Sequence, residues 1–279
     1  MLFTILLPKD DIDGAELGIH VVSLHQLKPI SSLNKTIVPK KRVFLRGKWN
    51  HLLFANYEVD PAVLQSHIPA GTTLDSWNEI VFLSLVAFRF SDTSVLGIPT
   101  LGWRNFDEVN LRFYVKCEVD QEIRNGVVFI KEIVPSWLVS KIANLLYGEN
   151  YQNKEMLSSV ELLPSSNKNI NYEVKDSNAS NNFSAFVENT GKIPPRDSLE
   201  SYITEHYWGY AKKDSKTTME YEVEHPQWKV TKVDDYGINF DFEQVYGNQY
   251  SFLSSLKPQS VFYCEGSEIS VRMGKKLKP

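Results

Sequence analysis

Polar and apolar side chains alternate most regularly between Glu108 and Val119. Successive side chains of a β-strand point to opposite faces. One face of the strand predicted here carries polar side chains: Glu108, Asn110, Arg112, Tyr114 and Lys116. The other face is apolar: Val109, Leu111, Phe113, Val115, Cys117 and Val119. The pattern predicts a strand that packs one face on a core and presents ionisable groups on the other.

A second predicted strand covers Gly126–Val134 and is apolar on both faces except at Lys131 and Glu132. A lysine in such an apolar run is either a chemically reactive residue or the partner of an ion pair. Since neighbouring strand residues point to opposite faces, Lys131 and Glu132 are expected on opposite sides of the sheet.

The same kind of pattern predicts further strands along the chain. They cover His51–Glu58, Ile80–Phe90, Thr218–Glu224, Gly237–Phe242 and Ser260–Arg272. The segments 170–174 and 183–187 are expected to form hairpins within a region rich in Ser and Asn. Strands at this spacing, without regular intervening helices, favour a barrel or a sandwich over a doubly wound sheet. We therefore expect a mainly β, β-rich α+β fold.

Three short helices interrupt the predicted strands. Asp60 and Pro61 are typical of the cap and first position of a helix that ends near His67. A helical stripe, Trp137, Leu138, Ile142, Leu145 and Leu146, ends at Gly148. The sequence Asp197–Glu200 resembles a capping box for a helix through about His206.

Residues 1–42 lack this patterning and end in the basic cluster Lys40-Lys41-Arg42. We predict two parts: a weakly ordered N-terminal extension over residues 1–42, and a single β domain over residues 43–279. The first seven residues are apolar, but no basic segment precedes them and no small-residue cleavage site follows. This favours a cytoplasmic protein without a signal peptide.

Composition narrows the classes of function. The 279 residues carry a formal net charge of −4, which gives no general basic field for nucleic acid. No apolar run reaches the length of about 18 residues that a membrane-spanning helix needs. Cys117 and Cys264 have no CxxC spacing and are expected to be reduced core thiols, with a disulfide as the alternative. No GxGxxG motif or P-loop is present, and no cofactor is expected.

The polar face of the first strand is the main candidate for a site. Turned into a barrel, Glu108, Asn110, Arg112 and Tyr114 would place a carboxylate, an amide, a guanidinium and a phenol in one cavity. Arg112 would then bind a carboxylate in a bidentate way. Buried charges require partners, so Glu108 and Arg112 are expected to interact. The alternative is an outer face with an ordinary ion pair.

Lysines and histidines give weaker signals. Burial would lower the pKa of Lys131 and favour a covalent role, while pairing with a carboxylate or exposure to solvent is the alternative. Lys116 lies near a strand end and is more typical of a solvated position. Glu205-His206 and Glu224-His225 are two Glu-His pairs, each followed by a tryptophan. Their spacing does not define a metal site, and we expect structural roles and no bound metal.

Several segments together resemble a known family. They read KWNHLLFANYEVDPAVLQSHIPAGTTLD, VFLSLVAFRF, FDEVNLRFYV, GVVFIKEIVPSW, EHYWGY and YEVEHPQW. In this order they resemble the YqjF-like family of uncharacterised bacterial proteins, which is distantly related to acetoacetate decarboxylase. The resemblance covers roughly residues 43–274. It implies an antiparallel acetoacetate-decarboxylase-like β-barrel with an internal cavity and a few short helices.

The resemblance also implies candidate roles. In the decarboxylase a lysine forms a Schiff base with the substrate ketone, and a second lysine lowers its pKa. Glu108 falls where that motif carries a cavity glutamate, and Lys131 lies near the place of the reactive lysine. Two departures are visible: Lys131 is farther from its preceding glycine, and its neighbour is Glu132 rather than a lysine.

These observations predict a polar cavity that binds a small organic acid or ketone. Arg112, Asn110, Tyr114 and Glu132 are the expected ligand-binding residues. The alternative is a Schiff-base lyase acting on an oxo acid, with Lys131 and Glu108 as catalytic residues. A third alternative is a structural module whose own side chains fill the cavity. The expected partner is a small molecule, not nucleic acid or a membrane, and a homo-oligomer is left open.

Overall fold

The computed structural model describes residues 42–277, except residues 101, 138, 142–143, 145–147 and 177–179. The predicted extension over residues 1–42 therefore lies outside the described residues, apart from Arg42. None of the described helices is long and apolar enough to cross a membrane.

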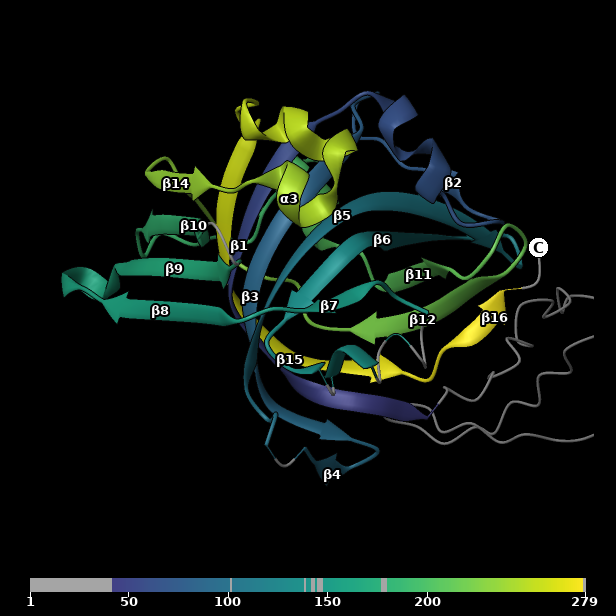
Figure 1. Ribbon diagram of the computed structural model, residues 1–279, viewed down its shortest axis with the longest axis horizontal. Coiled ribbons are helices and arrows are strands. Elements are labelled where there is room, and N and C mark those ends of the chain that lie inside the picture. The colour runs from purple at the N-terminus through teal and green to yellow at the C-terminus, as the bar shows by residue number, and fades with distance from the viewer. Residues whose placement is uncertain are drawn as a thin grey trace, which may run out of the picture. The chain divides into compact units, whose positions relative to one another are not determined.

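Seven strands of the larger sheet form a ring, visible around the centre of Figure 1. Each pairs with the next, and the pairing of Val223 with Val271 joins the last strand to the first. In order around the ring they are β15 (Ser260–Arg272), β1 (Val43–Glu58), β3 (Phe82–Val95), β5 (Phe106–Val119), β6 (Glu122–Val134), β11 (Trp208–Lys212) and β12 (Thr218–Glu224). The mainly β class predicted from the alternation is confirmed.

Short strands extend this ring at its edges. They are β2 (Thr73–Leu74) on β5, β4 (Ile98–Pro99) on β3, β7 (Tyr151–Asn153) on β6, β13 (Val230–Lys232) on β15 and β16 (Lys275–Leu277) on β12. The expected antiparallel arrangement holds for most pairs. The exceptions are β6 with β11 and β6 with β7, which run parallel. These two pairs arise because the chain leaves the ring after β6 and returns later in the same direction.

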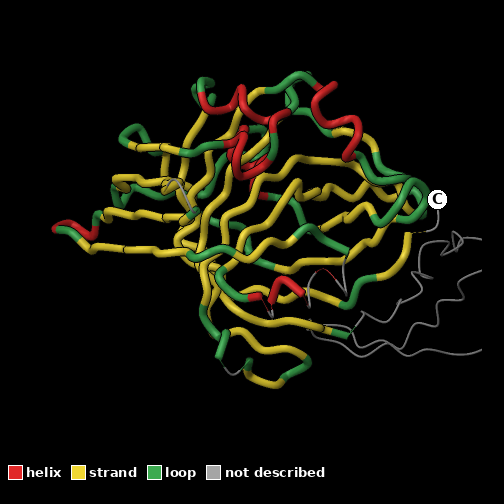
Figure 2. Tube along the Cα trace, viewed as in Figure 1, coloured by secondary structure: helices red, strands yellow, loops and turns green. Residues whose placement is uncertain are grey.

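A smaller antiparallel sheet lies against the outside of the ring, to the left in Figures 1 and 2. Its strands are β8 (Met156–Leu162), β9 (Lys168–Lys175), β10 (Ser180–Val187) and β14 (Tyr236–Asn239). Ile170, Tyr172 and Phe183 from this sheet pack in one core with Leu111 and Phe113 of β5. The apolar face predicted for β5 therefore points outwards, into the core between the two sheets.

Short helices, red in Figure 2, lie in the connections between strands. They are the 3₁₀ helices η2 (Pro61–His67), η3 (Pro164–Ser166) and η4 (Asn248–Ser254) and the α-helices α2 (Leu199–Thr204) and α3 (Phe242–Tyr246). The cap predicted at Asp60 is present, where the side chain accepts from the Ala62 N–H at 2.8 Å. The cap of α2 is Ser198, one residue after the start of the predicted capping box at Asp197, and it accepts from the Ser201 N–H at 3.2 Å. Leu199 and Ile203 of α2 pack into the core inside the ring.

The helix predicted after residue 136 is only partly described. The described positions Trp137, Lys141 and Asn144 are helical, and Gly148 has φ 75° with its N–H bonded to the Asn144 carbonyl at 3.0 Å. This agrees with the predicted C-terminal glycine. Leu138, Ile142, Leu145 and Leu146, which carried the prediction, lie outside the described residues. Cys117 and Cys264 are buried free thiols.

Candidate ligand-binding cavity

A cavity lies inside the ring. Its volume is about 130 Å³. One part of the lining is polar: Glu108, Asn110, Arg112, Glu132, Glu149, Tyr151, Thr204, His206, Tyr221 and His225. Most of the remaining lining is apolar or aromatic, including Trp49, Phe88, Phe90, Trp103, Phe106 and Trp228. An apolar cavity of about 150 Å³ is large enough to bind a molecule the size of benzene.

The predicted polar face of strand β5 points into this cavity. Glu108, Asn110 and Arg112 all line it, as the alternation required. Tyr114 lies in the wall beside it, where a hydrogen bond of 2.7 Å joins its hydroxyl to that of Ser84. Lys116 is partly exposed and forms an ion pair of 2.7 Å with Asp75.

The expected ion pair between Glu108 and Arg112 does not form within 4.0 Å among the described residues. Four residues along one strand span about 13 Å, which is too far for the two side chains to meet easily. The Glu108 carboxyl instead accepts a hydrogen bond of 2.9 Å from the Asn110 amide. Arg112 acts on Glu108 only at long range, where its charge favours the ionised carboxylate.

A β-bulge in β6 decides which of its two polar residues faces the cavity. Leu111 pairs with Lys131, but the next residue, Arg112, pairs with Phe129, so that Ile130 is left without a partner. A bulge adds one residue and reverses the alternation that follows it. Phe129 and Glu132 therefore line the cavity, and Lys131 is not among the lining residues.

Lys131 lies on the outer side of the wall, against α3. Its ammonium group donates a hydrogen bond to the Val245 carbonyl and lies 5.9 Å from the centre of the Tyr246 ring. Burial lowers the pKa of Lys131, and the positive charge of Lys154 lowers it further. Lys131 and Glu132 lie on opposite faces, as the sequence predicted. The structure thus separates Lys131 from the other candidate site residues.

Three carboxyl groups gather in the cavity, on Glu108, Glu132 and Glu149. Two tyrosines donate hydrogen bonds to them: Tyr151 donates to Glu108 at 3.4 Å and Tyr221 donates to Glu149 at 2.8 Å. The Tyr151 hydroxyl also interacts with the Glu132 carboxyl. The described residues contain no group of His, Cys, Asp or Glu side chains arranged to hold a metal ion. The cluster is therefore best described as a set of acids held by hydroxyl groups.

Burial sets the protonation of this acid cluster. It raises the pKa of Glu108 to about 7 and that of Glu149 to about 7. Burial raises the pKa of Glu132 well above its usual range, and the charges of Glu149 and Glu108 add to the effect. Carboxyls in close contact titrate as a coupled unit. These shifts favour the protonated form of Glu132, while Glu108 and Glu149 are poised between acid and carboxylate near neutral pH.

Arg112 carries a positive charge that no described carboxylate neutralises at close range. Its guanidinium carbon lies 5.3 Å from the centre of the Phe54 ring and 5.8 Å from that of the Tyr114 ring. Its Nε is buried and lacks a hydrogen-bond partner among the described atoms. Arg112 as a whole is partly buried, and a charge in such a setting is stabilised when a counter-charge is supplied. Among the described residues that line the cavity, Arg112 is therefore the one best suited to meet an anion.

Two histidines lie close to Arg112. His206 follows α2, and its Nε2 is 3.9 Å from the Asp75 carboxylate. His225 stacks on Trp228, with ring centres 4.1 Å apart and an interplanar angle of 16°. Burial lowers the pKa of both histidines, and the charge of Arg112 contributes. Both rings are thus neutral at physiological pH, and Arg112 keeps its role as the main cation.

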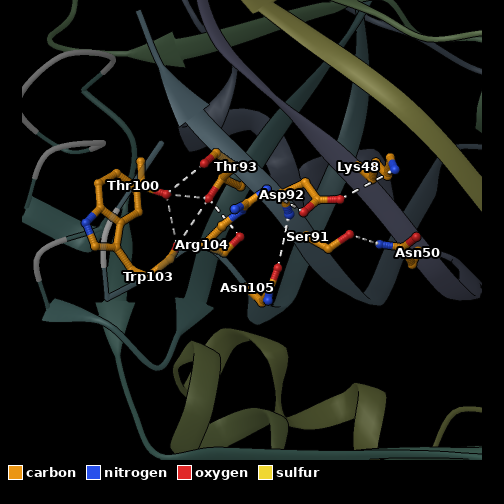
Figure 3. Close-up of polar contacts among 9 residues, drawn as sticks. All are labelled: Lys48, Asn50, Ser91, Asp92, Thr93, Thr100, Trp103, Arg104 and Asn105. Carbon is orange, nitrogen blue, oxygen red and sulfur yellow. Dashed lines mark hydrogen bonds and ion pairs between the residues drawn. The ribbon is translucent and has the colours of Figure 1, made fainter. Parts of the chain in front are cut away.

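A polar network outside the cavity holds Trp103 in the lining (Figure 3). The Thr93 and Thr100 hydroxyls lie 2.7 Å apart, and the Thr93 hydroxyl donates to the Arg104 carbonyl at 2.9 Å. The Arg104 guanidinium donates to Asp92 at 2.9 Å. These bonds fasten the connection between β3 and β5 on both sides of Trp103.

The family model for DUF2071, a family of uncharacterized conserved proteins, matches residues 46–268. The chain belongs to the DUF2071 family. This confirms the resemblance to YqjF-like proteins inferred from the motifs. A stretch of 79 residues is 34% identical to "Uncharacterized protein YqjF" of Bacillus subtilis. That stretch covers 28% of this chain and 33% of the relative, so only a third of the relative's length is matched.

Solved structures confirm the acetoacetate-decarboxylase-like fold of this DUF2071 protein. Acetoacetate decarboxylase from Legionella pneumophila aligns with a TM-score of 0.58 at 10% identity, over 92% of this chain and 98% of that one. The enduracididine biosynthesis enzyme MppR complexed with pyruvate aligns with a TM-score of 0.58 at 13% identity, over 89% and 95%. An acetoacetate decarboxylase-like enzyme from Sphingomonas wittichii aligns with a TM-score of 0.56 at 12% identity, over 84% and 93%. At these identities the likeness concerns the fold alone.

Sequence reasoning missed several residues of the DUF2071 cavity: Trp49, Glu149, Tyr151, Tyr221 and Trp228. They come from segments far apart in the chain, so no local pattern links them. The Glu-His pairs were a usable signal, since His206 and His225 both line the cavity. For Glu149, the sequence offered only a carboxyl just after the predicted helix-ending Gly148.

Proposed function

We propose that this DUF2071 protein binds a small organic acid inside the barrel, with Arg112 holding the ligand carboxylate. The observation that carries the proposal is the charge of Arg112, which faces the cavity without a close carboxylate among the described residues. A guanidinium is suited to this task, since its planar fork matches a carboxylate. The ligand carboxylate would supply the negative charge that no described carboxylate places next to Arg112.

The acid cluster would complete the recognition. A protonated carboxyl can donate a hydrogen bond, whereas an ionised one can only accept. Glu132, with its raised pKa, would donate to a carbonyl or hydroxyl oxygen of the ligand. Asn110 would add a neutral polar group, and Glu108 would change from donor to acceptor near pH 7. Tyr114 would support Arg112 from the wall.

The fold comparison supports this ligand class. MppR, which shares the fold, is described as complexed with pyruvate, a small oxo acid. A protein with this fold can therefore bind such a molecule. For the present chain the proposal rests on Arg112 and the acid cluster, because the identity to MppR is only 13%.

The proposal is tested by calorimetric titration with propanoate and pyruvate, with neutral propanamide for comparison. We expect Arg112→Gln to weaken both acids at least about tenfold, because a hydrogen bond to a charged group contributes about 1.5–3 kcal/mol. Arg89→Gln is the matched control: Arg89 is half exposed, pairs with Asp107 and does not line the cavity. Equal binding of acid and amide by the native protein would refute the proposal.

The alternative function is a Schiff-base lyase acting on an oxo acid. It requires a neutral amine that attacks the ligand ketone and releases water. Lys131 has a lowered pKa, which favours this chemistry, but its ammonium group contacts the Val245 carbonyl outside the cavity. No lysine is found among the described residues that line the cavity. These observations support binding over covalent catalysis.

Borohydride reduction separates the two functions. The protein is incubated with pyruvate or acetoacetate, reduced, and mapped by peptide mass spectrometry, with Lys131→Arg as the control. We expect no ligand-dependent mass increase on the peptide that contains Lys131. An adduct that appears with the ligand and disappears in Lys131→Arg would establish the lyase alternative.

A further inference from the structure

We infer that the acid bound by this cavity carries an aromatic ring, and that the ring lies in a cluster of aromatic side chains around Trp49. The inference rests on the proposed binding of a carboxylate by Arg112 and specifies the rest of the ligand. The aromatic cluster consists of six residues that all line the cavity: Trp49, Phe88, Phe90, Phe106, His225 and Trp228.

The cluster is continuous and has a defined geometry. The ring centre of Trp49 lies 5.4 Å from that of Phe88 and 6.0 Å from that of Trp228, with interplanar angles of 64° in both cases. Phe90 stacks on Phe106 at 4.6 Å. These are the edge-to-face and stacked arrangements that aromatic rings prefer. A ring of the ligand would meet both faces and edges of rings at this site.

The size of the cavity suits a ligand that carries one ring. The cavity volume is about 130 Å³. An apolar cavity of about 150 Å³ is large enough to bind benzene. Apolar ligand surface placed against these side chains is removed from water, which favours binding in proportion to area.

His225 links the two halves of the proposed site. Its ring stacks on Trp228 of the aromatic cluster, while it is close enough to Arg112 for that charge to lower the pKa of the imidazole. Trp228 is held in place by a hydrogen bond of 2.8 Å from its Nε1 to the Ser267 hydroxyl. His225 is thus a neighbour of both the guanidinium and the aromatic cluster.

The test compares three acids by calorimetric titration: propanoate, 3-phenylpropanoate and 3-cyclohexylpropanoate. All carry the same carboxylate, and the last two have similar size. We expect 3-phenylpropanoate to bind at least tenfold more tightly than propanoate and measurably more tightly than the cyclohexyl acid. Trp228→Leu should reduce the tenfold ratio between 3-phenylpropanoate and propanoate to less than threefold. Trp137→Leu is the control, since Trp137 is 59% exposed and does not line the cavity.

The outcomes separate this inference from the proposed function. If Arg112→Gln weakens all three acids equally but propanoate binds as tightly as 3-phenylpropanoate, the carboxylate site stands and the aromatic subsite is refuted. Equal affinity for the phenyl and cyclohexyl acids would refute the preference for an aromatic ring. If Arg112→Gln changes none of the affinities, the proposed function itself fails. Phe88→Leu provides a second variant should Trp228→Leu fail to fold.

Discussion

Glu108 shows how one buried carboxyl links stability to pH. Burial raises its pKa from 4.5 to about 7, so the folded state keeps a proton that the unfolded state releases between these values. The contribution of this group to stability is fully present below pH 4.5 and is lost as the pH rises through 7. The buried Glu108 carboxyl therefore costs little stability at low pH, where it is protonated, and destabilises the folded protein at high pH, where it is ionised.

Replacing Glu108 by Gln should remove this cost. We expect Glu108→Gln to increase the free energy of unfolding by about 1–3 kcal/mol at pH 8 and to leave it nearly unchanged at pH 5, because each pKa unit corresponds to about 1.36 kcal/mol. Urea denaturation at both pH values measures the difference. Glu118→Gln, an exposed change on the same strand, serves as the control. A variant less stable than the native protein at pH 8 would contradict this account.

The same acids should make ligand binding dependent on pH. Glu108 and Glu149 both have a pKa of about 7, so they gain negative charge between pH 6 and pH 8. A carboxylate ligand stays ionised throughout this range and is repelled more strongly as they ionise. We expect the affinity for propanoate to fall from pH 6 to pH 8 in titrations at constant ionic strength. An affinity that rises with pH would show that the acid cluster does not adjoin the ligand.

At the level of elements, close packing of β11 on β12 positions Tyr221. A Cβ added at Gly209 would lie 2.1 Å from the Tyr221 ring, so only glycine leaves room for the ring to cross β11. Tyr221 in turn donates its hydroxyl hydrogen to Glu149. The glycine therefore supports the acid cluster through a neighbouring strand.

Gly209→Ala should be destabilising, since forcing extra volume into a packed core costs about 1–3 kcal/mol. Thermal or urea unfolding measures this loss, and the pKa of the acid cluster should change because Tyr221 must move. Gly237→Ala is the control, because its Cβ would approach only the flexible Ser184 hydroxyl, at 2.9 Å. Equal stability of the two variants would argue against tight packing at Gly209.

At the scale of the whole molecule, the ring and its two cores are complete within the described residues 42–277. Each ring strand finds both neighbours there, and β12 closes on β15. We therefore predict that removal of residues 1–41 leaves a protein that unfolds cooperatively, with a melting temperature close to that of the full chain. Calorimetry of both proteins provides the comparison. Loss of the cooperative transition would mean that the N-terminal segment completes the core.

The sequence alone determined the properties that depend on local patterns. Alternation with period two fixed the two faces of β5 and placed Glu108, Asn110 and Arg112 together on one of them. Side-chain chemistry predicted the helix start at Asp60, where an oxygen accepts from a free backbone N–H, and located the start of α2 to within one residue, at Ser198 instead of Asp197. These features need only a few neighbouring residues, so they can be predicted without knowing the fold.

Only the tertiary structure decided what depends on pairing between distant segments. The bulge at Ile130 arises where β6 has one more residue than β5 in their pairing. It turns Lys131 outwards and Glu132 towards the cavity. Unbroken alternation from Val127 would instead put Lys131 on the cavity face. Glu149 and Tyr221 meet because β12 closes the ring beside β11. Register and closure are set by contacts across the whole chain, and one inserted residue is enough to reverse a face.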